Sequence, residues 1–228
     1  HRDGESAPGF LDDYAFLAWG LIELYETTFD AAWLVEARAL MEAATGLFGG
    51  GEGPYRFAGQ DTEPLIARTV EVYDGAHDSG NSVAAMNLLR LAQFAGDAAL
   101  HAEARRLLAA AGGLAEQVPA NFTALLCALD TAIGPTREIV VAGPDGPATA
   151  GMLRAIRERF LPRTVVLRLM DAGRQGAIEA FAPFLAAMDV PASGAVAYLC
   201  EDSSCRAPID DAAALAAALD GHERKDDR

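Results

Sequence analysis

The sequence is poor in positively charged residues. It has 18 Lys and Arg against 33 Asp and Glu, which gives a formal net charge of −15 at pH 7. Because this excess of acids repels phosphate groups, we predict that neither nucleic acid nor an anionic membrane surface is a partner. The sequence also lacks any run of about eighteen apolar residues, so we predict no membrane-spanning helix.

Cysteine is equally scarce, with three residues in a chain of 228. So few cysteines exclude a scaffold built on disulfides and favour a reducing, cytoplasmic location. The first residues are polar, lack the apolar core of a signal peptide and do not include Met, so we expect a fragment or a processed product. Hydrophobic residues make up 51% of the chain, which excludes a disordered protein and predicts one or two folded domains.

Residues 1–135 have a helical pattern in which apolar and amphipathic segments alternate. The first, third and fifth segments are apolar on nearly every face, as buried helices are, whereas the second and fourth carry a single apolar stripe. Residues 30–40 are partly repeated in residues 97–107, an offset of 67. A helical hairpin used twice is typical of a stacked or closed repeat, so we predict a mainly α domain with an inner and an outer layer of helices.

A long Gly-rich insert, residues 50–78, separates the two predicted hairpins. Within it, Pro54–Phe57 and Leu65–Arg68 have the pattern of two short strands, so we predict a loop that contains a β-hairpin. Such a long connection on a rigid scaffold often carries function.

The pattern changes after residue 135. Residues 136–220 alternate short apolar runs with helical segments, which predicts a small α/β segment with three short, parallel strands. The loop Gly143–Pro147, which follows the first of these strands, lacks the G-x-G-x-x-G pattern and has two prolines without amide donors, so we predict no nucleotide site there. We predict no cofactor for the chain. Residues 221–228 form a charged tail.

Two polar clusters lie at the starts of the first and third predicted helices. Asp12, Asp13 and Tyr14 form one cluster, and residues 71–82 form the other. At the offset of 67, Gly80 is equivalent to Asp13, so we expect both clusters to face one cavity. The alternative is that the acids only cap the helices by accepting hydrogen bonds from unpaired backbone N–H groups.

The acids of these clusters are candidates for acid–base chemistry. Glycoside hydrolysis uses a pair of carboxylates, and we predict Asp12, Asp13 and Asp74 for these roles. An epimerase would usually need a pair of basic residues, and the helical region offers only His77 and His101 as candidates, so the sequence favours a hydrolase. The residues predicted to bind the substrate come from the same two clusters: Tyr14, Glu71, Tyr73, His77, Asn81 and Ser82.

Cys200 and Cys205 lie five residues apart at the end of the third predicted strand. They could close a small disulfide, supply half of a metal site, act in thiol redox chemistry, or be two ordinary cysteines beside a turn. Zinc usually takes four ligands, and no further Cys or His is close in the sequence, so we predict no metal. A disulfide, a redox pair and two ordinary cysteines all stay open.

Four segments together resemble one protein family: GFLDDYAF (9–16), EVYDG (71–75), SGNSVAA (79–85) and YLCEDSSCRAP (198–208). They are similar to the carboxy-terminal part of the thioredoxin-domain-containing proteins of the spermatogenesis-associated protein 20 group. The resemblance implies a thioredoxin-like domain joined to a six-hairpin, glycosidase-like (α/α) toroid. Five helices cannot close a ring of six hairpins, so it implies a partial toroid here, with a cavity that a second copy or another chain could complete.

Three functions compete at this point. The resemblance implies a carbohydrate-related, glycosidase-like domain with a carbohydrate ligand. The second function is a non-catalytic binding or scaffold module that serves the thioredoxin-like domain as its partner. The third is a thiol redox role for Cys200 and Cys205.

Overall fold

The computed structural model describes residues 8–63, 67, 69–170, 176–201 and 204–226. The chain divides into two compact units. The first comprises His1–Gln93 and Asp97–Ile133, and the second comprises Phe94–Gly96 and Gly134–Arg228. None of the helices in the described ranges is long and apolar enough to cross a membrane.

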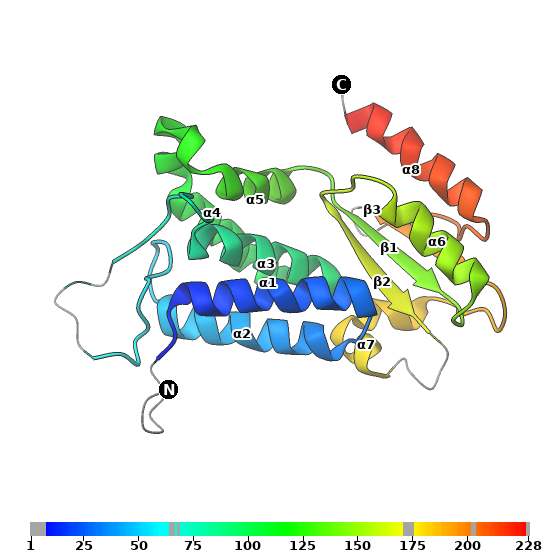
Figure 1. The fold of residues 1–228 in the computed structure, drawn as a ribbon, viewed down its shortest axis with the longest axis horizontal. Coiled ribbons are helices and arrows are strands. Elements are labelled where there is room, and N and C mark those ends of the chain that lie inside the picture. Colours follow the sequence, from blue (N-terminus) through cyan, green and yellow to red (C-terminus); the bar gives the residue numbers. More distant parts are fainter. Residues whose placement is uncertain (1–7, 64–66, 68, 171–175, 202–203, 227–228) are drawn as a thin grey trace. The chain divides into compact units, whose positions relative to one another are not determined.

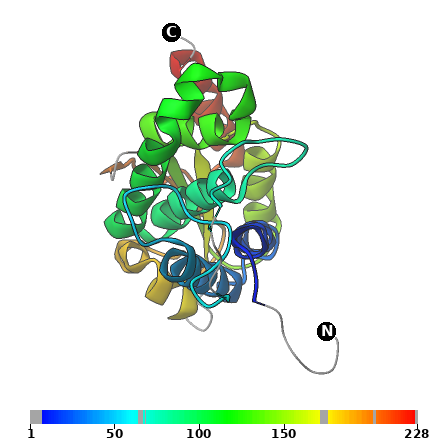
Figure 2. The ribbon, with the colours of Figure 1, turned by 90° about the vertical axis from the view of Figure 1, so that its left-hand side faces the viewer.

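The first unit is built from helices, as its apolar stripes predict, and Figures 1 and 2 show the first two helices side by side. A short 3₁₀ turn, Pro119–Asn121, precedes the last of them. The helices are α1 (Leu11–Thr28), α2 (Ala32–Phe48), α3 (Gly80–Ala95), α4 (Ala98–Gln117) and α5 (Thr123–Ile133).

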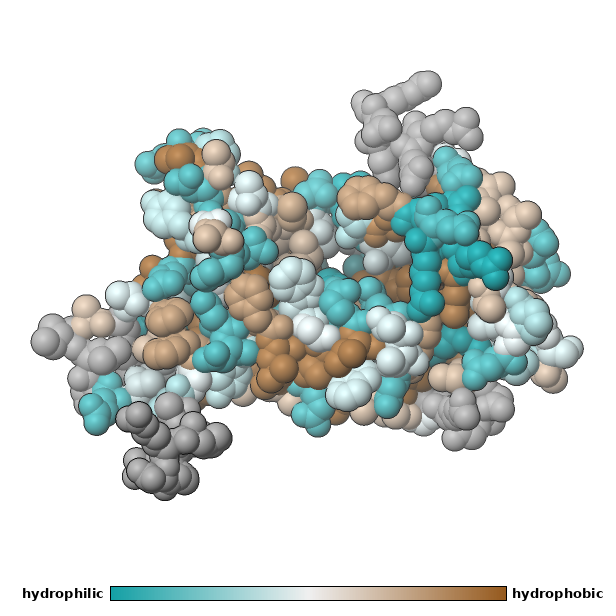
Figure 3. Space-filling view, in the orientation of Figure 1, coloured by the Kyte–Doolittle hydropathy of each residue, from teal (hydrophilic) through white to brown (hydrophobic). Residues whose placement is uncertain are grey.

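Small buried residues explain why α1 and α2 form a close pair. Ala15 and Ala18 of α1 are fully buried, as are Ala37 and Ala44 of α2, and residues spaced by three, four or seven positions share one face of a helix. Phe29 ends α1 in the left-handed conformation, with φ 57°, and its N–H bonds the Tyr25 carbonyl. On the solvent side of the pair, apolar side chains remain at the surface over α1 (Figure 3).

The insert between α2 and α3 contains no strand among its described residues, and Leu65, Ile66 and Arg68 of the predicted β-hairpin lie outside the described residues. Tyr55 holds the insert against the helices, because its ring is fully buried and its hydroxyl is 2.7 Å from Glu103 Oε1 of α4. The same hydroxyl is 2.8 Å from Thr45 Oγ1 of α2. The Tyr55 side chain therefore anchors the segment, and the Phe57 N–H also donates to the Thr69 carbonyl oxygen at 2.8 Å.

The second unit has a four-stranded sheet in the order β2-β1-β3-β4 among the residues described. β1 pairs with β2 in parallel and with β3 in antiparallel orientation, and β3 pairs with β4 in antiparallel orientation. The strands are β1 (Arg137–Ala142), β2 (Thr164–Leu169), β3 (Val196–Glu201) and β4 (Ser204–Cys205), and the helices are α6 (Pro147–Arg157), α7 (Gly176–Phe181) and α8 (Ala212–Asp226).

The sheet corrects the prediction of three parallel strands. Between β1 and β2 lies the full helix α6, as a parallel crossover requires. Between β2 and β3 the six-residue α7 stops at Phe181, and Pro183 opens a 3₁₀ turn instead of continuing the helix. This connection returns the chain in the opposite direction, so β3 pairs with the other edge of β1 as an antiparallel strand.

One face of this sheet forms the core of the second unit. Ile139, Val141 and Leu199 point to this face and are almost completely buried. They pack with Met152 of α6 and Leu215 of α8, so these two helices cover the sheet on that side (Figure 1).

Candidate functional site

A pocket of about 300 Å³ lies among α1, α3 and α5 of the first unit. These are the three helices whose sequences are apolar on nearly every face. α1 contributes Trp19, and Asp78 comes from the loop before α3. The other lining residues are Ser82, Val83, Met86 and Asn87 of α3 and Thr123, Ala124 and Cys127 of α5.

The starts of α1 and α3 meet beside this pocket. Asp12 is half-buried, and its carboxylate accepts a hydrogen bond from the Gly80 N–H. A Cβ atom at position 80 would collide with Asp12 Oδ1, so only glycine permits this approach. Burial raises the pKa of the Asp12 carboxyl, although His77 and the Gly80 N–H act in the opposite direction.

The loop before α3 brings His77 and Asp78 to the same place. The His77 ring is exposed and lies edge-on to Phe16 of α1, with 6.2 Å between the ring centroids. Its Nδ1 is 2.9 Å from the Asp78 carbonyl oxygen, which can only accept, so this nitrogen carries the proton. Asp78 itself is half-buried and lines the pocket.

The predicted catalytic residue Asp74 joins this loop to the start of α5. Its Oδ1 accepts a hydrogen bond from the Ser79 N–H at 2.9 Å, and its Oδ2 accepts from the N–H groups of Ala124 at 2.8 Å and Leu125 at 3.1 Å. In this structure Asp74 therefore acts as a cap of α5 supplied by a distant loop. Tyr73, the residue before it, is exposed and packs on Phe122 with 5.0 Å between ring centroids.

Asn81 and Ser82 are buried and make their hydrogen bonds within the protein. Asn81 Oδ1 accepts from the Tyr55 N–H at 2.8 Å, and its Nδ2 donates to the carbonyl oxygens of Tyr55 at 3.0 Å and Glu71 at 2.7 Å. Ser82 Oγ lies 2.9 Å from Ser79 Oγ. The side chain of Glu71 is exposed. Asn81 thus holds the insert against α3, while Ser82 borders the pocket.

Asp13 and Tyr14 are directed elsewhere. Asp13 is exposed, and its Oδ2 accepts a hydrogen bond from the Phe10 N–H at 2.8 Å, which closes the first turn of α1. Tyr14 packs edge-on against Phe48 at the end of α2, with 5.2 Å between ring centroids. Of the predicted residues, the structure thus brings Asp12, His77 and Ser82 together around the start of α3, with Asp74 behind them.

Several residues that line the pocket do not stand out in the sequence. Trp19 and Cys127 are part of apolar stripes that predict core positions, yet both side chains are exposed. The clearest overlooked signal is Asn87, an amide within an otherwise apolar helix. Its Nδ2 donates to the Ala15 carbonyl oxygen at 2.8 Å, but its Oδ1 is buried and has no hydrogen-bond partner among the described residues.

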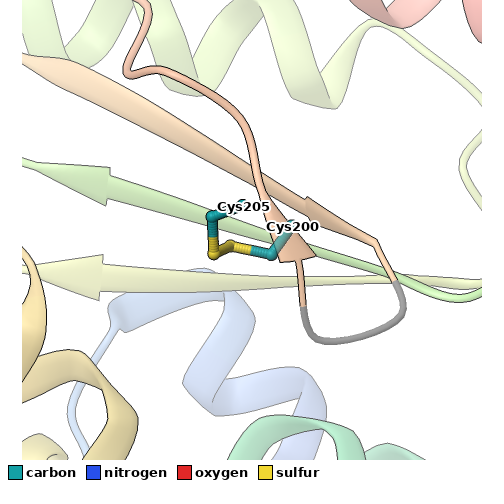
Figure 4. The surroundings of a disulfide bond; sticks show 2 residues. All are labelled: Cys200 and Cys205. Atoms are coloured by element: carbon teal, nitrogen blue, oxygen red, sulfur yellow. A yellow bond between two sulfur atoms is a disulfide. The ribbon is translucent and has the colours of Figure 1, made fainter.

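The second unit contains a disulfide between Cys200 and Cys205 (Figure 4). The two residues face each other across β3 and β4, with 3.9 Å between their Cα atoms. Cys200 is buried and Cys205 is exposed. Of the arrangements that the sequence leaves open for this pair, the structure shows the disulfide. In the described ranges, no three His, Cys, Asp or Glu side chains are grouped so as to hold a metal ion.

Comparison with known proteins places these features in context. No family model matches the chain. It is 32% identical to human spermatogenesis-associated protein 20 and 31% identical to the mouse protein, in each case over 206 residues, or 89% of this chain. An uncharacterized protein of Caenorhabditis elegans is 27% identical over 201 residues. The chain spans about a quarter of the length of these relatives (26% to 27%). The matches support a place for this chain among the relatives of spermatogenesis-associated protein 20.

Proposed function

We propose that the first unit is a carbohydrate-binding, glycosidase-like domain whose ligand lies in the pocket among α1, α3 and α5. The observation that carries the proposal is the combination of an exposed aromatic ring, Trp19, with the carboxylate of Asp78 and the amide of Asn87 around one pocket. Sugars present apolar C–H faces together with hydroxyl groups, which suit an aromatic ring and such acceptors. At about 300 Å³ the pocket is at the small end of ligand sites, which favours a single sugar unit.

Asp12 is the acid–base residue that we favour for a hydrolytic reaction. Burial raises the pKa of its carboxyl, which is the direction that a general acid requires. Asp12 contacts Gly80, which lies between Asp78 and Ser82 of the pocket wall. Asp13 and Asp74 remain candidates, but their carboxylates accept hydrogen bonds from backbone groups of neighbouring segments.

The two tryptophans allow a direct test of binding. The chain has Trp19 in the pocket wall and Trp33 on α2, so the variant Trp33→Phe leaves Trp19 as the sole tryptophan fluorophore. We expect a saturable change in its fluorescence when neutral methyl glycosides are added. In the unmodified background, Trp19→Phe should weaken binding measured by calorimetry, whereas the matched control Trp33→Phe should not.

Absence of saturable binding for every glycoside tested would refute the carbohydrate proposal and favour the scaffold function. If binding is found, turnover of aryl glycosides separates a lectin-like site from an enzyme. In that assay Asp12→Asn should abolish turnover and leave binding, whereas the control Glu36→Gln, at an exposed position of α2, should leave both unchanged.

A second candidate function is thiol redox chemistry, which is favoured by the disulfide between Cys200 and Cys205. In such a reaction, a thiolate of a dithiol reductant attacks the exposed sulfur of Cys205, the S–S bond breaks and Cys200 leaves as a thiolate. The second thiol of the reductant then releases Cys205 and forms its own disulfide. Equilibration with dithiol buffers of stepped potential, followed by alkylation and mass spectrometry, tests it; a pair that never exchanges contradicts this function.

A further inference from the structure

The amide of Asn87, a residue of the pocket wall, has an unused hydrogen-bond acceptor. The orientation of the amide is settled by its neighbour, because the Ala15 carbonyl oxygen can only accept and the Asn87 nitrogen lies 2.8 Å from it. The amide oxygen is then left without a partner among the described residues, and Asn87 is only 1% exposed. Buried polar groups in proteins are nearly always paired, and Asn87 is a residue of the pocket wall, so a ligand bound there could supply the missing donor to this covered oxygen.

Among the described residues that line the pocket, the one charged side chain is acidic. Asp78 is a carboxylate in the wall, and neither Lys nor Arg is among the described residues that line it. The cation on the next turn of α3, Arg90, is held by Glu23 at 2.6 Å and Glu26 at 3.0 Å. An anionic ligand would therefore meet a carboxylate without a compensating cation, whereas a hydroxyl group would find an acceptor in Asp78 and a second in Asn87 once its covering side chain moves.

We propose that this pocket selects neutral, hydroxyl-bearing sugar units over uronates and sugar phosphates. The hydroxyl groups of the ligand donate to the Asp78 carboxylate and to Asn87 Oδ1, while Trp19 contacts an apolar face of the ring. Asn87 Oδ1 is covered in this structure, so contact with it requires a lining side chain to shift, and Met86 is the most adaptable of them. This inference rests on the proposed function, and it specifies the class of ligand.

The test compares two ligands that differ at one position. Methyl glucoside and methyl glucuronide share their ring, but the glucuronide carries a carboxylate where the glucoside has a primary alcohol. We expect the Trp33→Phe chain to bind the glucuronide about tenfold more weakly, as like-charge contacts disfavour a ligand. Asp78→Asn removes the repelling charge and should bring the two affinities closer together. Asn87→Leu should weaken binding of the glucoside.

The location of binding is read from Cys127, which is the free thiol of the chain and lines the pocket. Bound glucoside should slow alkylation of Cys127 by iodoacetamide, because it covers the same wall. Circular dichroism checks that Asn87→Leu is folded. If this variant is not folded, the inference is tested by the ratio of the glucoside and glucuronide affinities in Asp78→Asn.

The possible outcomes distinguish a failure of this inference from a failure of the proposed carbohydrate-binding function. Equal or tighter binding of the glucuronide, or a ratio that Asp78→Asn leaves unchanged, overturns the selection for neutral sugars while the sugar site stands. Binding that leaves the alkylation rate of Cys127 unaltered places the site elsewhere and also overturns the inference. If neither ligand nor any other sugar binds, the proposed function itself fails.

Discussion

Removal of the Asp74 carboxylate should destabilise the first unit. The carboxylate accepts three backbone N–H groups, two at the start of α5 and one from Ser79. Loss of a helix cap costs about 0.5–2 kcal/mol. The Ser79 N–H belongs to a residue that is 5% exposed, and leaving such a donor unpaired costs about 1–3 kcal/mol. We therefore expect Asp74→Ala to lower the free energy of unfolding by about 2–4 kcal/mol.

Urea unfolding monitored by tryptophan fluorescence measures the free energy of unfolding of the first unit, which contains Asp74. Both tryptophans, Trp19 and Trp33, belong to the first unit, so their signal reports its unfolding rather than that of the sheet unit. Asp74→Asn keeps one acceptor oxygen, so its free energy of unfolding should fall by less than that of Asp74→Ala. Glu36→Ala, at an exposed position of α2, is the control and should change stability by less than about 0.5 kcal/mol.

The result that refutes this reasoning is a loss in Asp74→Ala no larger than that of the control. If the same variant had also lost glycoside turnover, the carboxylate would act in catalysis and not as a cap. A large loss of stability in Asp74→Ala, with sugar binding retained in the folded Asp74→Asn, would instead establish the capping role.

Three further predictions rest on single contacts. Because burial raises the folded-state pKa of Asp12 above 3.8, the free energy of unfolding falls as pH rises through the interval between the unfolded and folded pKa values. Asp12→Asn should thus gain stability relative to the parent chain over that interval, as measured by urea titrations from about pH 3 to pH 7. Gly80→Ala should cost about 1–3 kcal/mol through its collision with Asp12, and the double variant with Asp12→Ala should recover part of this loss. Reduction of the Cys200–Cys205 disulfide, which closes a short loop, should lower the stability of the second unit by about 2 kcal/mol in circular dichroism and leave the tryptophan transition unchanged.

The helices of the first unit could be predicted because their signal is local. Apolar side chains recur with the helical period, and Asp97 at the start of α4 caps it by accepting from the N–H groups of Ala99 and Leu100. The direction of β3 could not be predicted in this way. The direction of β3 depends on where α7 ends and on which edge of β1 is free to pair. The residues of β3 itself determine neither of these two features.

In the candidate site, too, features that depend on neighbouring residues could be predicted from the sequence, whereas contacts between distant residues could not. The acids at the starts of α1 and α3 stand out in the sequence, and the structure brings Asp12 next to Gly80. The partners of Asp74, however, lie 50 and 51 residues further along the chain, so its capping role depends on the tertiary fold. The position of Trp19 in an apolar stripe predicts core, because a stripe does not reveal that the neighbouring helices leave a pocket beside it.

The walls of the pocket come from every second helix of the first unit. Its described lining includes residues of α1, α3 and α5, and none from α2 or α4. The shape of the pocket therefore depends on α1, α3, α5 and the loop before α3, and the outward surfaces of α2 and α4 do not contribute to it. Substitutions on those outward surfaces are expected to leave the pocket walls unchanged, whereas a few substitutions on the other three helices would reshape them.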